Sequence, residues 1–474
     1  MADANRVQVS TLEEKTWGTT NGLVGTILVN DASHVAVGDT SVEIDGTGAA
    51  ALTVGDTFTV AGDTQVYIVT IDNGATNVSF SPAAKVAWQD NTAITTNNFV
   101  ALPITGGSMS ESPDTVRSSQ LRSDAQMADM KRTGVEPAAA FDFEMQADNL
   151  DNLLRAALRN SPANTWSNFQ KTAAADSVTI ATDKTYTSTT ATFFGANAAA
   201  ANLAIPKGSW IYISGCGDAA NDGWKQVSKT TATTATVLTV EQACAAGSSE
   251  EPTFTSSQIR NGSDLTSFSL QMGNLDVTNG YRVTTGARIT DFGLNMTSQA
   301  IITGNVGFSG KKMSQVDAIT NTAVTAAADT DVMSEVSTFE SFWIGGTEIT
   351  TYEIVSASLN IATTARPQVG LGNLQKVGMN LGPIDITGSV EFYLESANFK
   401  TLQNYLLDFT SFEFGFALSD GTNRYFFHMP QVKLTSEPGT VGGIDTDMML
   451  SFDFAADPAD IGGVTKTIQV SRVS

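Results

Sequence analysis

The sequence is poor in the residues from which catalytic and metal centres are usually built. Among 474 residues there are only two cysteines, Cys216 and Cys244, and two histidines, His34 and His428. Two cysteines without clustered histidines cannot form the usual kind of zinc site, and a catalytic triad would have to use one of two isolated histidines. We expect two buried thiols, with a disulfide between them as the alternative, and a strand position for His428 in RYFFHMP.

Motifs of nucleotide-dependent and hydrolytic enzymes are missing as well. The sequence contains no P-loop, no GxGxxG after a strand, no HExxH, no GxSxG elbow and no EF-hand loop. Carboxylates are abundant, so the pair of catalytic acids that glycosidases use remains an alternative. We expect no enzyme, no cofactor and no metal ion.

Positive charge is scarce. The chain has 26 Lys and Arg against 49 Asp and Glu, a formal charge of −23. Binding to phosphates requires Lys and Arg, so this balance argues against nonspecific binding to nucleic acid or to an anionic membrane. No apolar run approaches the ~20 residues that cross a bilayer, and no apolar segment typical of a signal peptide follows Met1–Arg6. We expect a soluble protein made in a cytoplasm.

Glycine and β-forming residues are plentiful. The chain has 40 Gly and many short apolar runs rich in Thr and Val, broken by turn dipeptides such as Asp45-Gly46 and Asn73-Gly74. These features predict a mainly β protein.

One segment occurs twice. Ala138–Asn160 and Thr387–Phe409 both begin with alternating apolar and polar residues and continue as an amphipathic helical pattern. Phe143 and Phe392 are related by a spacing of 249 (392 − 143), and the same spacing relates the other apolar positions. We therefore predict two copies of a strand–helix unit. The predicted helices are Leu150–Leu158 and Phe399–Leu407.

After the helices the spacing falls to 144, which relates Phe268 to Phe412 and Tyr281 to Tyr425. An inserted module after the first helix accounts for the difference. That module is itself related to an earlier one, because Leu52–Gly62 aligns with the later segment IPKGSWIYISG. The predicted organisation is a first unit made of 1–19, 99–164 and 259–310, β modules at 20–98 and 165–258, a linker at 311–338 and a second unit at 339–474.

The strands of the repeat carry acids between apolar residues. In FDFEM, Phe141 and Phe143 share one face of the strand, and Asp142 and Glu144 share the other. The simpler interpretation is that each acid lies on a solvated face of the sheet, where it needs no partner. The alternative is that these acids together line one water-filled surface; the candidates are Asp142, Glu144, Glu391, Glu413 and Asp453.

A long polar segment precedes the first strand–helix copy. Glu111–Pro137 has its counterpart in Ile361–Pro383. A polar segment of this length inside a compact domain is typically functional or mobile. The charged candidates in the two segments are Arg117, Arg122, Asp124, Lys131, Arg132, Arg366 and Lys376.

Three stretches resemble a known family. NRVQVSTLEEKTWGTT, SESPDTVRSSQLRSDAQMADMKRTG and FDFEMQADNLDNLLRAAL are similar to segments of the tail tube proteins of long-tailed (siphophage-like) bacteriophages, particularly those with a doubled tube domain. The resemblance covers the two core units, and the two β modules are variable additions to it.

This resemblance implies two β-sandwich-like tube units, each with one short helix, whose inner sheets join those of neighbours into a continuous β-barrel. Rings of the barrel would stack into a hollow tube through which double-stranded DNA passes. Two units per chain imply a homotrimeric ring with pseudo-six-fold symmetry. The acids named above would face the lumen, and the long loops would reach the next ring or the adjacent subunit.

The resemblance further implies a location in the virion tail after synthesis in the host cytoplasm. Tail terminator or neck proteins, tail-tip proteins and the tape measure protein would be its partners. The β modules, Ig-like or SH3-like, would lie outside the tube.

Two other functions stay open. One is a capsid decoration or fibre protein. The other is a carbohydrate-binding adhesive protein, for which Trp210 and Trp224 in the second module are the leading candidates. Trp210 aligns with Thr57, on the face opposite Phe58, and is therefore expected to be exposed.

Overall fold

The protein is mainly β in the computed structural model. The structure describes residues 6–21, 27–30, 35–46, 52–63, 65–72, 77–124, 126–161, 167–172, 178–189, 193–194, 207–230, 237–319, 324–334, 339–349, 354–393, 396–436, 447–461 and 464–473. His34 lies outside these residues. Within them, no helix is long and apolar enough to cross a membrane.

Two sets of strands pair in the same order, which confirms that the sequence repeat is a repeat of structure. The first set pairs in the order β9 (Gly106–Arg117), β10 (Met130–Glu144), β21 (Thr303–Ser309), β20 (Tyr281–Thr297), β19 (Phe268–Asn274), β1 (Val7–Glu13). The second set pairs in the order β26 (Ile354–Gln368), β27 (Gly378–Tyr393), β30 (Met449–Ala456), β29 (Arg424–Ser436), β28 (Phe412–Ser419), β24 (Phe339–Ile344). The start of β20 also pairs with β22 (Lys312–Val316), and the start of β29 pairs with β33 (Gln469–Val473).

The register corrects one detail of the repeat. In the first set Gly273 pairs with Tyr281, and in the second set Ala417 pairs with Phe426. Tyr281 therefore corresponds to Phe426, a spacing of 145 (426 − 281), and not to Tyr425. A shift of one residue matters because neighbouring side chains on a strand point to opposite faces.

The two sets form one long sheet because β20 pairs with β26. Asp291–Thr297 of β20 runs antiparallel to Ser356–Ala362 of β26. The order across both sets is then β9–β10–β21–β20–β26–β27–β30–β29. The resulting sheet spans both halves of the chain without interruption.

Helices follow the repeated strands as predicted. α1 (Asp151–Ala157) comes after β10 and α3 (Ser396–Leu407) after β27. Leu153 and Leu154 of α1 and Leu402 of α3 are buried in the main apolar core. Such short helices are not stable alone in water, and this packing holds them in place.

The first module is a closed barrel. Its strands are β2 (Ile27–Val29), β3 (Ser41–Asp45), β6 (Asn77–Ser81), β5 (Tyr67–Asp72), β4 (Thr57–Val60) and β7 (Ala93–Thr96). Phe58, Tyr67, Phe80 and Trp88 pack ring against ring in a core separate from that of the long sheet. β8 (Phe99–Leu102) connects the barrel to β1, and β23 (Val324–Thr325), within the predicted linker, pairs with β8 in parallel.

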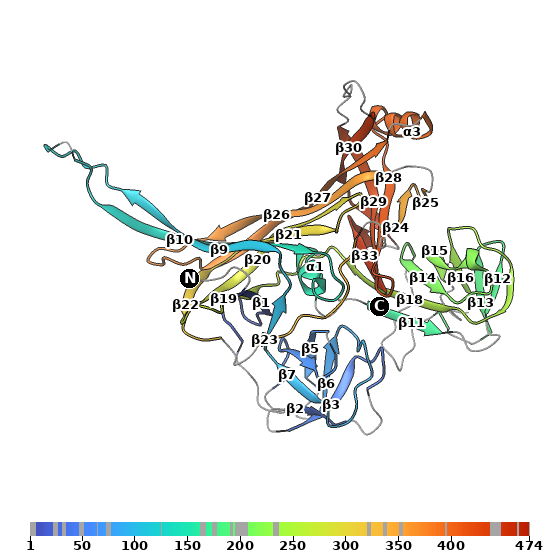
Figure 1. The fold of residues 1–474 in the computed structure, drawn as a ribbon, viewed down its shortest axis with the longest axis horizontal. Helices are drawn as coiled ribbons and strands as arrows, with labels where there is room; N and C mark the ends of the chain where they lie inside the picture. Colours follow the sequence, from blue (N-terminus) through green and yellow to red (C-terminus); the bar gives the residue numbers. More distant parts are fainter. Residues whose placement is uncertain are drawn as a thin grey trace.

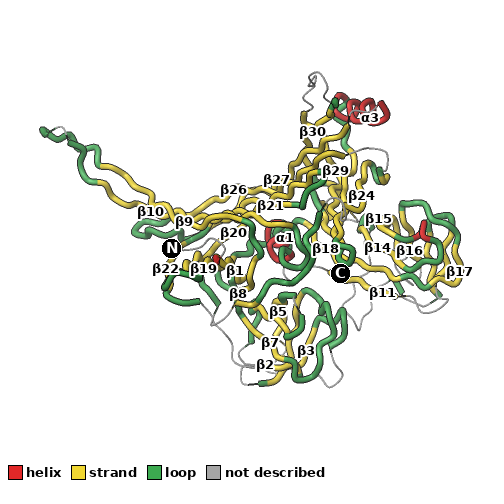
Figure 2. Tube along the Cα trace, viewed as in Figure 1, coloured by secondary structure: helices red, strands yellow, loops and turns green. Residues whose placement is uncertain are grey.

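The second module has its own core and adjoins the second set of strands. Its strands are β11 (Ser167–Thr172), β12 (Val178–Ala181), β13 (Thr185–Ser188), β14 (Trp210–Ser214), β15 (Gly223–Thr230), β16 (Val237–Val240), β17 (Gly247–Glu250) and β18 (Thr253–Arg260). β18 pairs with β33, which places the module beside the second set, as Figures 1 and 2 show. Cys216 and Cys244 are free, partly buried thiols against the module core, and burial raises the pKa of the Cys216 thiol.

Trp210 does not present a free face. It is 1% exposed, stacks on Phe426 with ring centroids 4.3 Å apart and contacts Trp343 edge-on. Trp224 is buried in the same cluster. The expectation of exposure was wrong because Trp210 lies where the module packs against the second set of strands. The two tryptophans stabilise the contact between the second module and the second set of strands.

Candidate functional site

One face of the long sheet is apolar and buried, and the other is polar. On β10, Phe141 and Phe143 are buried while Asp142 is exposed; on β27, Val390 and Phe392 are buried. The alternation follows from the period of two along a strand, so each strand contributes one set of side chains to the core and one to the opposite face.

Small residues dominate the polar face. Directly paired residues lie on the same face of a sheet, so the register identifies its members. Its uncharged residues are Gly106, Ser108, Ser110, Ala138, Ala140, Gly293, Asn295, Thr297, Thr303, Asn305, Gly307, Ser309, Ser356, Ser358, Asn360, Ala362, Thr387, Ser389, Ser451, Ala455 and Ser436. Tyr393, 39% exposed at the end of β27, is an aromatic side chain on this face, where it pairs with Met449; the residues between it and the start of β27 on this face are small or polar.

The charges on this polar face are mostly negative. Its acids are Asp142, Glu144, Asp291, Asp385, Glu391 and Asp453, and its cations are Lys433 and the buried Arg288, which pairs with Ser309. Within the described residues, none of these acids forms an ion pair; Asp291 accepts a hydrogen bond from Asn305 Nδ2 at 2.8 Å, and Glu391 accepts one from Ser356 Oγ at 3.2 Å. The face therefore keeps a net negative charge.

Two of these acids were missed from the sequence. Asp385 lies between Ile384 and Ile386, the same pattern that identified Asp142, so the signal was present. Asp291 follows a register shift after Ile289, which breaks the alternation, and only the pairing reveals its face.

Glu413 has to be removed from the group. It lies on β28, and its carboxylate is 4.0 Å from His428 Nε2 and faces the second module. β29 passes from the long sheet into a second layer, where its first half pairs with β28 and β33. An acid between two phenylalanines on β28 therefore faces a different surface.

The hairpin of β9 and β10 projects far from the body (Figure 1). Its charges are partly neutralised within the arm, since Arg122 pairs with Asp124 at 2.6 Å and Arg132 with Glu111 at 2.8 Å. Lys131 pairs with Asp129, and Arg117 lies at the end of β9. Aliphatic side chains on the arm remain uncovered: Val116, Leu121, Met127 and Met130. Leu121 is fully exposed, at 103%.

The hairpin of β26 and β27 reaches the same end of the sheet and also carries uncovered aliphatic residues. These are Val369, Leu371, Leu374 and Val377, and Leu371 is 106% exposed. Its two predicted cations act within the chain. Arg366 donates to the carbonyl of Leu381 at 3.1 Å, and Lys376, only 4% exposed, donates to Ser309 Oγ at 3.3 Å. The aliphatic tips, more than these cations, are available for contact with another molecule.

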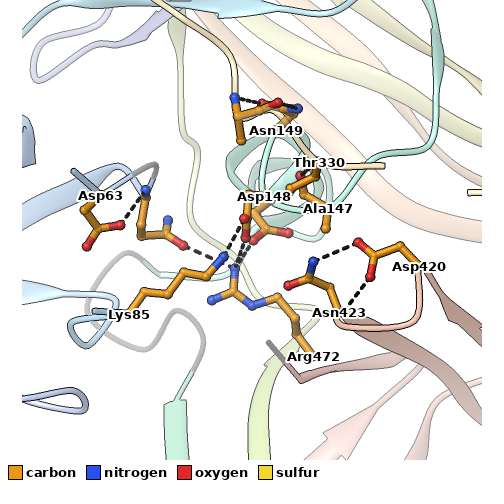
Figure 3. Close-up of polar contacts among 12 residues, drawn as sticks. Asp63, Lys85, Ala147, Asp148, Asn149, Thr330, Asp420, Asn423 and Arg472 are labelled. Carbon is orange, nitrogen blue, oxygen red and sulfur yellow. Dashed lines mark hydrogen bonds and ion pairs between the residues drawn. The ribbon is translucent and has the colours of Figure 1, made fainter. Parts of the chain in front are cut away.

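A buried charge cluster joins four parts of the chain (Figure 3). Arg472 of β33 donates to Asp151 of α1 and lies 3.8 Å from Asp148, which Lys85 of the first module contacts at 2.5 Å. Tyr425 of β29 donates to Asp151 at 2.7 Å. Burial lowers the pKa of the Arg472 guanidinium, and the nearby Asp148 raises it. Because its members are far apart in the chain, nothing in the sequence indicates this cluster.

Residues 4–456 match the sequence model of a family described as "Phage tail tube protein". The chain belongs to this family. The match includes both sets of strands and both modules of the tube protein. No curated protein matches the sequence. The family is a structural one and not a family of enzymes, and membership identifies the chain as a component of the virion tail that assembles with itself into a tube.

Proposed function

We propose that this tube protein is the major subunit of the tail tube, and that three copies form each ring of a stacked conduit for ejection of double-stranded DNA. One observation carries the proposal. The pairing of β20 with β26 joins two equivalent units within the chain, and β29 and β9, which correspond to β20 and β26, could form the same pairing between two chains.

The internal junction defines the expected junction between chains. β9 corresponds to β26 at a spacing of 250, since Met109 pairs with Ala139 as Leu359 pairs with Gly388. β29 corresponds to β20 at 145. Within the described residues, β9 pairs only with β10, so its outer edge is open.

Asp291 pairs with Ala362 inside the chain. The equivalent residues between chains are Ser436 (291 + 145) and Ser112 (362 − 250). An exposed strand edge is a template for another chain, and a head-to-tail contact of this kind closes into a ring when its rotation allows. Three chains with two units each give a pseudo-six-fold barrel.

A cysteine pair tests this register. With Cys216 and Cys244 replaced by serine, the variant Ser112→Cys/Ser436→Cys is expected to form disulfides between chains under mild oxidation. Closed rings should run as covalent trimers on a denaturing gel. The matched control, Ser108→Cys/Ser436→Cys, displaces one cysteine by four residues, roughly 14 Å along the strand, which is beyond the reach of a disulfide. Equal cross-linking in both variants would contradict the register.

The polar face is the proposed lumen wall. A DNA duplex is repelled by carboxylates, and small uncharged residues offer it neither a stacking surface nor cations. The outer partners in the tail would be terminator or neck proteins and tail-tip proteins, and the tape measure protein would occupy the lumen before the DNA does.

Lysines on this face should hinder the passage of DNA. We expect Asp142→Lys/Glu391→Lys/Asp453→Lys to assemble into tubes of normal diameter but to slow or block ejection, because phosphates would bind the wall. The measurement is DNA release from virions triggered in vitro. A control with the same change in charge, Asp90→Lys/Asp183→Lys/Glu251→Lys, places the lysines on the modules. Normal ejection by the first variant would refute the lumen assignment.

A further inference from the structure

A groove separates the second module from the hairpin of β24 and β25 (Thr347–Glu348), which lie next to each other in Figure 1. It consists of two adjoining cavities of about 650 and 510 Å³. Glu241, Gly346 and Thr347 line both. Cavities of such sizes fall within the roughly 300–1,000 Å³ range of small-molecule sites.

The local fold keeps this groove open. Ile344 pairs with Thr347, so Gly345 and Gly346 form a two-residue turn, with φ of 60° and 73°. Glycine is favoured there, as both central residues of such a turn need positive φ. A Cβ on Gly346 would also lie 3.4 Å from the carboxylate of Glu413. The turn therefore borders the groove with backbone and little side-chain bulk.

Two residues that line this groove carry buried polar atoms for which the described residues provide no hydrogen-bond partner. His428 is 2% exposed and lines the smaller cavity, and neither of its ring nitrogens has a hydrogen-bond partner. Gln242 lines the larger cavity, and its Nε2 also has none. An unsatisfied buried polar group destabilises the folded state, and such groups are uncommon in folded proteins. Their presence on both sides of one groove points to a ligand.

The lining combines acceptors with donors. Glu241 and Glu413 supply carboxylates. The pKa of Glu413 is raised mainly by burial and also by the charge of Glu241, and a hydrogen bond from Gln226 lowers it in part. Lys207 and Lys225 supply ammonium groups. A cation would leave the amide of Gln242 unsatisfied, and an anion would be repelled by the carboxylates. A neutral polyol can donate to the carboxylates and accept from the amide and imidazole.

We propose that this groove binds a neutral oligosaccharide. Two adjoining cavities suit at least two linked sugar rings, and Trp224 and Trp343, largely buried in the contact between the module and the second set of strands, form part of the wall of the larger cavity. Within the described residues, no group of three His, Cys, Asp or Glu side chains is arranged for a metal ion. The site is separate from the polar face, so it does not depend on the proposed conduit.

The test is saturation-transfer NMR on the full-length protein with maltotriose, cellotriose, chitotriose and mannotriose as probes. At least one trisaccharide should show transfer that an excess of the same sugar saturates. Thr347→Trp, at an exposed position on β25, is expected to fill the groove and weaken this binding at least tenfold without changing the melting temperature. Glu241→Gln/Gln242→Ala should weaken it to a similar degree by removing hydrogen-bond partners.

The control is Glu251→Gln, an exposed acid on the same module outside the groove, which should bind as the unaltered chain does. Spermidine is the cationic competitor. The proposal is overturned if none of the trisaccharides binds, if Thr347→Trp binds as well as the unaltered chain, or if spermidine occupies the groove and the sugars do not.

Discussion

Replacing Arg472 with alanine is expected to destabilise the folded chain by about 3–5 kcal/mol, the usual effect of removing one partner from a buried ion pair. The side chains of Arg472, Asp148 and Asp151 are 6%, 3% and 2% exposed, so water cannot replace the guanidinium. Two carboxylates would then be left buried beside each other, with Lys85 paired to Asp148. The loss should appear as a lower urea midpoint of the unpolymerised chain, monitored by tryptophan fluorescence.

Two further variants distinguish the charge effect from lost packing. Arg472→Ala/Asp148→Asn/Asp151→Asn removes the uncompensated charges and should recover more than half of the loss. Arg122→Ala breaks an ion pair whose side chains are 49% and 42% exposed, and it should leave the urea midpoint almost unchanged because solvent screens exposed pairs. If Arg472→Ala proves no more destabilising than Arg122→Ala, the cluster does not hold the four parts together.

Removing the two fully exposed leucines at the hairpin tips should prevent ring stacking. Leu121 and Leu371 are fully exposed, at 103% and 106%, and burying a leucine stabilises an interface by about 1.5–3 kcal/mol. α3 lies at the other end of the long sheet from the β9–β10 hairpin (Figure 1). Leu407, the last residue of α3, and Phe409, just after it, are 72% and 60% exposed. We propose that the tips of one ring dock at this end of the next.

Leu121→Ser/Leu371→Ser is therefore expected to raise the protein concentration needed for tube formation by at least a hundredfold, with an unchanged melting temperature of the single chain. Sedimentation of tubes against concentration measures this. Val54→Ser, at a half-exposed position on the first module, is the control. Tubes that form at the usual concentration from the tip variant would show that stacking uses other contacts.

The sequence predicted the repeat because both copies keep the same alternation and the same helix after it. It also predicted the polar side of β10, where Asp142 alternates with Phe141 and Phe143. Alternation identifies the two faces of a strand, but it does not identify the layer in which the strand lies. Glu413 was misplaced for that reason.

Long-range packing was beyond the reach of sequence patterns. Trp210 was expected to be exposed because its alternation is correct within the module, but the second set of strands covers that face. The partners of Arg472 come from α1 and from the preceding loop, and no local pattern in β33 indicates them. The one-residue shift of the repeat in β29 appears only in the pairing of strands.

The most direct test of the central claim is electron microscopy of the purified protein together with its mass in solution. We expect rings or tubes with a central hole, each ring having the mass of three chains and six similar units around the hole. A ring of six chains would contradict the continuous pairing of β9 with β29, because then only one unit of each chain would line the barrel. A monomer that forms no tubes even with tail-tip proteins present would contradict the conduit itself.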